Sequence, residues 1–112
     1  MNWMKLNHID DLKIRTIKSF TDILILKHLK SHPLSSGYQV LRHLYDGYDV
    51  LCSPGTLYKE IYLLERKGLI KAEGDQNSRI YSLTDEGQKV LETAVKTSKQ
   101  IQELVSEILS IV

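Results

Sequence analysis

This sequence has no pair of cysteines, no long apolar run and no large excess of either charge. Because Cys52 is the only cysteine, no disulfide can form within the chain, and cysteine usage gives no indication of secretion. The longest apolar runs, such as Ile23–Leu26, are far too short to span a bilayer, and the first residues turn acidic where a signal peptide would be apolar. We therefore expect a cytoplasmic protein without membrane contact.

The charge balance and the missing catalytic motifs exclude further classes. Fifteen lysines and arginines against 14 acidic residues give a net charge of +1, which argues against a strongly basic coat protein for nucleic acid but not against a local basic patch. A glycine-rich phosphate loop, a nucleophile elbow and catalytic carboxylate pairs at helical spacing are all missing from the sequence. We expect one small globular unit that is not an enzyme and holds no cofactor.

Apolar spacing predicts a long helix near the start of the chain. It is expected over residues 13–31 and ends before Pro33, and Asn7 can cap a short helix or turn ahead of it. The consecutive apolar residues Ile23–Leu26 make this helix apolar nearly all round. Such a helix is covered on more than one side, and a partner chain is a candidate for the second cover.

A second helix is expected over residues 34–48, with its N-cap at Ser35 or Ser36. Its apolar stripe, which we expect to be buried, consists of Tyr38, Leu41, Leu44 and Tyr45. A turn and a short extended piece are expected at residues 46–52.

The third expected helix begins after Ser53, holds Pro54 in its first turn and ends at Gly68, a residue suited to the left-handed conformation that closes many helices. One face collects the apolar residues Leu57, Ile61 and Leu64, flanked by Glu60 and Glu65. The other face carries groups that suit phosphate oxygens and base edges, among Gly55, Thr56, Tyr58, Lys59, Tyr62, Leu63 and Arg66. A merely solvated helix face is the alternative, and the two glutamates weaken an electrostatic case for nucleic acid.

Two short strands and a final helix complete the expected fold. Residues 69–73 and 79–83 predict a hairpin around a polar tip at 74–78. Thr84 caps a last helix that runs almost unbroken to Val112. The result is a mainly α protein with a small β-hairpin, a winged helix-turn-helix with N- and C-terminal dimerisation helices. We expect an N-terminal extension at residues 1–20, a DNA-binding domain at 21–84 and a dimerisation helix at 85–112.

The expected wing carries one clear cation, Arg79, beside the polar donors Asn77 and Ser78. An arginine on a wing can reach a DNA backbone or a minor groove. Asp75 in the same loop opposes this interpretation, and turn residues are polar for their own reasons.

Three stretches resemble the PadR family of winged-helix transcriptional regulators. They are "SSGYQVL" at residues 35–41, "SPGTLYKEIYLLERKGLI" at 53–70 and "RIYSLTDEG" at 79–87. Together with "DILILKHLKSHPLS", they carry the resemblance over roughly residues 21–91. This sequence departs from the family at Ser82, where a second aromatic residue is frequent, in a wing with fewer basic residues, and in a longer N-terminal segment that includes Trp3.

The resemblance implies a homodimeric DNA-binding regulator, often a repressor, whose third helix enters the major groove and whose wing tip touches the backbone. By match to the motif, the residues at or near DNA would be Ser53, Thr56, Tyr58 and Lys59, with Arg79 from the wing. The family also pairs through its terminal helices.

The last helix carries its own signal for dimerisation. A heptad seam runs through Leu91, Ala94, Ser98, Ile101, Val105, Ile108 and Val112, and the stripe is widened by Val90, Thr97, Leu104 and Ile111. A lone helix of this kind would expose a large apolar patch, and a twofold partner is the commonest cover. Trp3 is expected to staple the N-terminal segment to the partner's last helix; lining a pocket for a planar ligand is the alternative.

The histidines and Cys52 are two further candidate sites, and both have a simpler structural interpretation. His28 and His32 have a spacing that can bind a metal, but no third and fourth ligands accompany them, so we interpret them as histidines near a helix C-terminus; His8 and His43 are isolated. Cys52 is interpreted as a buried small hydrophobe, with a redox-sensitive thiol as the alternative.

The hypothesis is therefore a homodimeric regulator, a repressor, on a pseudo-palindromic operator. Lys59 and Tyr62 are the candidates for base contact, while Tyr58, the Ser53–Thr56 turn and Arg79 would contact phosphates. A winged-helix protein-interaction module, a sequence-tolerant DNA architectural protein and a regulator with a small-molecule effector are the alternatives.

Overall fold

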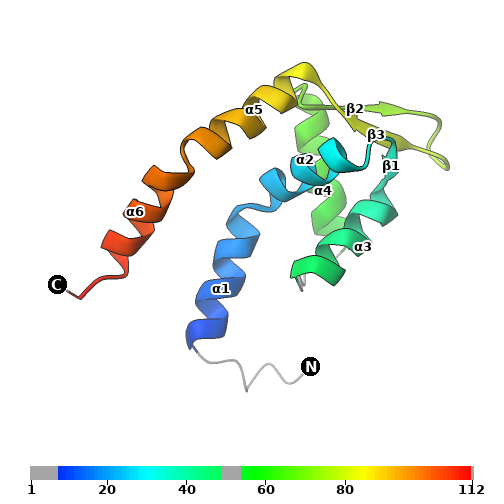
Figure 1. The fold of residues 1–112 in the computed structure, drawn as a ribbon. Helices are drawn as coiled ribbons and strands as arrows, with labels where there is room; N and C mark the ends of the chain where they lie inside the picture. The colour runs from blue at the N-terminus through cyan, green and yellow to red at the C-terminus, as the bar shows by residue number, and fades with distance from the viewer. Residues whose placement is uncertain (1–7, 49–53, 112) are drawn as a thin grey trace.

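The computed structural model describes residues 8–48 and 54–111. Its elements, in chain order, are α1 (His8–Ser19), α2 (Thr21–Ser31), β1 (Ser35–Ser36), α3 (Gly37–Tyr48), α4 (Pro54–Arg66), β2 (Ile70–Glu73), β3 (Ile80–Leu83), α5 (Asp85–Lys96) and α6 (Ser98–Ile108) (Figure 1). The mainly α winged helix-turn-helix expected from the sequence is confirmed. The positions that sequence analysis singled out at Trp3, Asn7, Cys52, Ser53 and Val112 lie outside the described residues.

The core forms around α2, which packs against α3, α4, α5 and β3. The buried apolar side chains are Ile25, Leu26 and Leu29 of α2, Val40 and Leu44 of α3, Leu57, Ile61 and Leu64 of α4, and Ile70, Tyr81 and Leu91. Within each helix they follow the three- and four-residue spacing of one helix face. The cover that the apolar α2 requires thus comes largely from its own domain.

One continuous helix over residues 13–31 was expected, and this expectation was wrong. The chain breaks at Phe20, where φ is −110° and ψ is 17°. The hydroxyl of Ser19 donates to the carbonyl of Thr16 over 2.7 Å, and that of Thr21 donates to Lys18 over 3.0 Å. Such local side-chain bonds compete with the helical backbone bonds, and periodicity does not report them. α1 therefore leaves the winged body as a separate helix (Figure 1).

The last helix was expected to run almost unbroken to Val112, but it breaks at Thr97, between α5 and α6, and α6 ends at Ile108. Thr97 donates its hydroxyl to the carbonyl of Thr93 over 2.9 Å. The backbone bond from Ile101 to Thr97, at 3.0 Å, continues the ladder, so the two helices follow each other as one bent arm. Figure 1 shows this arm and α1 projecting from the body on the side away from the wing.

The start of α3 is fixed by a capping box. Gln39 donates its backbone N–H to Ser36 Oγ at 3.1 Å, and Ser36 donates its own to Gln39 Oε1 at 2.8 Å, which confirms Ser36 as the cap. The expected buried stripe is only half right. Leu44 is buried and Leu41 half-buried, but Tyr38 and Tyr45 are 63% and 48% exposed, and Gly37 and Val40 take their place. The helix also continues to Tyr48, through the first residues of the expected turn.

The wing is a hairpin of β2 and β3, as expected, with one addition. β3 also pairs with the short β1, which gives a three-stranded antiparallel sheet in the order β1-β3-β2. Ile80 thus lies opposite both Glu73 and Ser36, and Tyr81 opposite Ala72 and Ser35. The central strand β3 therefore joins the wing to the start of α3. No helix within the described residues is long and apolar enough to cross a bilayer.

Candidate nucleic-acid interface

The fourth helix buries one face and exposes the other. Leu57, Ile61 and Leu64 are at most 2% exposed and point into the core. Of the residues proposed to meet DNA, the structure places Thr56, Tyr58, Lys59 and Tyr62 together on the exposed side of α4, whereas Ser53 lies outside the described residues. The exposed side thus offers a cation, aromatic planes and hydroxyls.

Tyr58 is held in place by the start of α3. A Cβ added to Gly37 would lie 2.3 Å from Tyr58 Cε1 and 2.9 Å from its hydroxyl oxygen, so the ring lies directly on the glycine backbone. Only a residue without a side chain leaves room for this contact. The contact joins the two helices of the helix-turn-helix and directs the half-exposed Tyr58 along the outer surface.

Further along the same face, Tyr62 is paired with Arg66. Arg66 donates from a guanidinium nitrogen to the Tyr62 hydroxyl at 3.2 Å, and its guanidinium carbon lies 5.8 Å from the Tyr62 ring centroid. Lys59 forms no ion pair with any described residue. Two cations and two tyrosines therefore line the outer side of α4.

The wing loop is closed by Asp75. Its carboxylate oxygen Oδ1 accepts hydrogen bonds from the backbone of Asn77 at 2.9 Å, the backbone of Ser78 at 3.0 Å and the hydroxyl of Ser78 at 3.0 Å. These bonds, with the Ser78 hydroxyl first, hold the pKa of Asp75 below its ordinary value. The backbone N–H groups of Asn77 and Ser78 and the Ser78 hydroxyl therefore serve to close the turn.

Arg79 is engaged within the protein. Its guanidinium donates to both carboxylate oxygens of Glu65 on α4, at 2.7 and 2.9 Å. These bonds and the Glu65 charge, with a smaller contribution from Tyr81, raise the pKa of Arg79. The sequence alone gives no sign that Arg79 and Glu65 meet, because 14 positions separate them.

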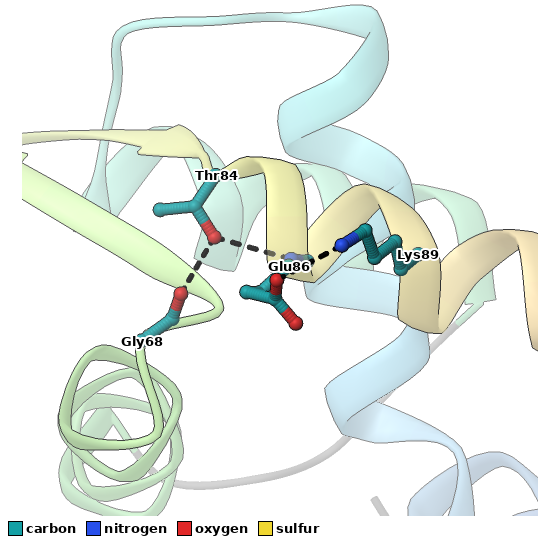
Figure 2. Close-up of polar contacts among 5 residues, drawn as sticks. Gly68, Thr84, Glu86 and Lys89 are labelled. Atoms are coloured by element: carbon teal, nitrogen blue, oxygen red, sulfur yellow. Dashed lines mark hydrogen bonds and ion pairs between the residues drawn. The ribbon is translucent and has the colours of Figure 1, made fainter.

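Figure 2 shows the junction where α4, the wing and α5 meet. Thr84 donates its hydroxyl to the Gly68 carbonyl at 2.6 Å and accepts from the Gly87 N–H at 3.1 Å, which confirms Thr84 as the cap of α5. Gly68 has a φ of +77°, as expected for the residue that closes α4. A Cβ on Gly87 would lie 2.1 Å from the Leu69 carbonyl oxygen. Both ends of the wing are thus fixed tightly to the helical body.

A cluster of three histidine rings lies between α2 and α3. The ring centroid of His28 is 4.8 Å from that of His32 and 4.4 Å from that of His43. The description of His43 as isolated was therefore wrong, because the contact depends on how two helices pack. Burial of His28, followed by its neighbours His43 and His32, lowers its pKa to about 4, so the helix dipole does not dominate there. Within the described residues no group of three His, Cys, Asp or Glu residues is arranged to hold a metal.

The apolar stripe of the C-terminal arm divides into two parts. Leu91 is buried and Val90 and Ala94 are half-buried against the body. Beyond Thr97 every described residue is exposed, including the apolar Ile101, Leu104, Val105, Ile108, Leu109 and Ile111. Within one chain, α6 is therefore an amphipathic helix whose apolar side faces solvent.

These features define a winged helix-turn-helix protein with an exposed α4 face and a terminal helical arm. The model of the transcriptional regulator PadR-like family matches residues 25–93, which is more than half of the chain. The chain belongs to this family, whose members are transcriptional regulators and not enzymes. The resemblance found in the sequence is thus confirmed.

Solved structures agree with this assignment. A PadR family transcription regulator from Clostridium difficile R20291 is 26% identical with a TM-score of 0.68, covering 81% of this chain and 99% of its own. A transcriptional regulator from Clostridium thermocellum is 25% identical with a TM-score of 0.72, covering 86% of this chain and 96% of its own. A PadR family regulator from Eggerthella lenta DSM 2243 shares the fold, at 21% identity and a TM-score of 0.73, covering 93% and 94%. None of the curated proteins compared matches the chain.

Proposed function

We propose that this protein is a sequence-specific DNA-binding regulator, a repressor, which acts as a homodimer on a pseudo-palindromic operator. The observation that carries the proposal is the exposed face of α4, with Tyr58, Lys59 and Tyr62, in a chain of the PadR-like family. A recognition helix needs one buried and one exposed side in this way, because it must be held rigidly while its side chains reach into the major groove.

Each residue of the face has a proposed role. Lys59 and Tyr62 contact base edges, and Tyr58 and the turn from Ser53 to Thr56 contact phosphates. Tyr58 suits a phosphate contact since Gly37 fixes its ring at the outer edge of the helix-turn-helix. Arg79, bound by Glu65, is the cation that the wing contributes beside the duplex. This pairing also neutralises one of the two glutamates that argued against nucleic acid.

The homodimer is proposed from the exposed side of α6. A groove of about 630 Å³ between α2 and α5 is lined by apolar side chains such as Leu91 and Val95. Its charged lining residues are three lysines and one acid: Lys27, Lys30, Lys96 and Glu92. The partner's α6 would bring an apolar stripe with two exposed acidic residues, Glu103 and Glu107, which complement these lysines. Two domains joined in this way present two α4 faces to half-sites about one helical turn apart.

The first experiment titrates the protein with a duplex taken from upstream of its own gene and with a scrambled duplex, each at two salt concentrations. Specific regulation predicts affinity for the native duplex roughly a thousandfold above the scrambled one. Equal and steeply salt-dependent binding would indicate a sequence-tolerant DNA protein. If the protein binds neither duplex, the exposed face of α4 is better interpreted as a protein-docking surface.

Lys59→Ala is expected to weaken binding to the operator about tenfold or more, since a lysine that pairs well with a base edge contributes on the order of 1–3 kcal/mol of discrimination. The measurement is a DNA titration, with sedimentation to show that the dimer persists. Lys89→Ala is the matched control, because Lys89 lies on α5 and pairs only with the exposed Glu86 among described residues. An operator affinity as high as that of the unmodified protein would remove Lys59 from the interface.

Gly37→Ala is expected to lower operator affinity several-fold while costing about 1 kcal/mol of unfolding free energy, the lower end of the range for an added methyl group. The new methyl group pushes the far end of the Tyr58 ring out of its present position, toward the solvent on its half-exposed side. Gly47→Ala in the same helix is the control, because nothing lies within 4 Å of its added Cβ and alanine favours the helix. Equal operator affinity for the two variants would show that the placement of Tyr58 is unimportant.

A further inference from the structure

The ion pair between Arg79 and Glu65 differs from the other ion pairs among the described residues. Each of the others joins two exposed residues that lie three or four positions apart in one helix. Such pairs contribute little to stability. Arg79 and Glu65 join the wing to α4 with two bonds, at 2.7 and 2.9 Å, and the Glu65 side chain is only 26% exposed. One guanidinium nitrogen, Nη2, donates to both carboxylate oxygens, and such charge-assisted bonds are stronger than bonds between neutral groups.

This pair lies where it can control the position of the wing relative to α4. The wing is fixed at its base, where Thr84 bonds to Gly68, and its tip is closed only by Asp75 within the loop itself. Arg79 stands just before β3, at the point where the loop joins the strand that pairs with both β1 and β2. Glu65 is in the last turn of α4. The pair therefore links the last turn of α4 to the start of β3, beyond the bonds at the base of the wing.

We propose that Glu65 and Arg79 are positioning residues, which hold the wing against α4 so that both can meet one DNA duplex. This rests on the proposed DNA-binding function, and it refines the role of Arg79: the guanidinium acts through Glu65 and is not itself a phosphate ligand. A phosphate would have to displace a half-buried carboxylate that already accepts two bonds from Arg79 Nη2, at 2.7 and 2.9 Å. The negative charge of Glu65 is compatible with a helix that faces DNA, because Arg79 neutralises it.

The two roles predict opposite effects of Glu65→Gln on operator affinity. If Arg79 were a phosphate ligand, removing the carboxylate would release it and remove a repulsive charge, so binding would tighten. As a positioning residue, Glu65 is required, and we expect Glu65→Gln to weaken binding about three- to fivefold, the range of a well-formed exposed ion pair. Glu60→Gln is the matched control: it removes the same charge from the same helix, and Glu60 forms no ion pair with a described residue, so binding should not weaken.

The experiment titrates the operator duplex with Glu65→Gln, Arg79→Gln and the double variant at several salt concentrations. We expect both single variants to weaken binding and the double variant to be no weaker than either, because each breaks the same pair. The salt dependence should be unchanged. Tighter or equal binding by Glu65→Gln would overturn the proposal, as would a salt slope reduced by about one phosphate contact in Arg79→Gln.

Hydrogen exchange of the free dimer separates this proposal from the proposed function. In Glu65→Gln the backbone amides around residues 73–80 should exchange faster, whereas those of α2 and α4 should not. Unchanged wing amides would contradict the positioning role even if DNA binds. If exchange is faster but the protein binds no duplex, the proposed DNA-binding function is wrong. The positioning of the wing by Glu65 and Arg79 would then still hold. Should Glu65→Gln fail to fold, Glu65→Asp keeps the charge, shortens the reach and is expected to show the same exchange.

Discussion

Placing two charges on the apolar side of α6, by Leu104→Glu with Ile108→Glu, converts the dimer to monomers and lowers operator affinity by about two orders of magnitude or more. Leu104 and Ile108 are 50% and 67% exposed in the single chain, so the monomer loses little when they are replaced. In the proposed dimer they are buried, where an unpaired carboxylate is costly. Loss of the second half-site then removes the avidity that tethering provides.

The measurement is sedimentation equilibrium of the free protein, followed by DNA titration. Gln102→Glu with Ser106→Glu adds the same two charges at the same spacing on the polar side of α6 and should leave the dimer intact. Ending the chain before Ile101 should also give monomers. A dimer that survives both the charged variant and the truncation would place the interface elsewhere in the chain.

The sequence predicted the wing hairpin, the core face of α4 and the caps at Ser36, Gly68 and Thr84. These depend on local rules: the spacing of apolar residues, hydroxyl groups at helix starts, and glycine where φ is positive. The exposed side of α4 followed from the same spacing. Family resemblance then placed that side in a regulator.

The features that the sequence left out depend on packing between distant segments. Tyr38 and Tyr45 were expected in the core because tyrosine is largely apolar, yet Val40 fills the space beneath α3. The bond between Arg79 and Glu65 and the stacking of His43 on His28 arise only when elements meet. The break at Phe20 arises from hydroxyl groups that compete with the helix on either side of it. Local periodicity contains none of this information.

Acidification from pH 7 to pH 4 is expected to remove about 3 kcal/mol of stability through His28 alone. The side chain of His28 is 6% exposed, and its pKa is lowered from 6.5 to about 4, first by burial and then by His43 and His32. Between these values the unfolded chain binds a proton that the folded chain does not, so stability rises with pH across this window. A difference of about 2.5 pKa units corresponds to roughly 3 kcal/mol, a large part of the stability of a small domain.

The hydrogen bonds explain why the folded protein keeps His28 neutral. Ser35 donates its hydroxyl proton to the His32 carbonyl at 2.7 Å, so the contact of 3.1 Å between Ser35 Oγ and His28 Nε2 needs the proton on the histidine. Nδ1 is then the bare nitrogen, and it is buried without a hydrogen-bond partner. A second proton there would be an unpaired charge, close to His32 and His43, with Lys27 lining the same cavity and no carboxylate among its lining residues.

The test compares urea unfolding of the unmodified protein and of His28→Gln from pH 7 to pH 4 at one protein concentration. Glutamine keeps a donor for Ser35 and cannot titrate, so the difference in unfolding free energy between the two proteins should shrink by about 3 kcal/mol as the pH falls. The carboxylates, Asp75 among them, are present in both proteins, so their effects cancel in the comparison. His43→Gln is the control; since burial is the larger cause, most of the pH dependence should remain. Parallel curves for the unmodified protein and His28→Gln would show that the histidine cluster stores no such energy.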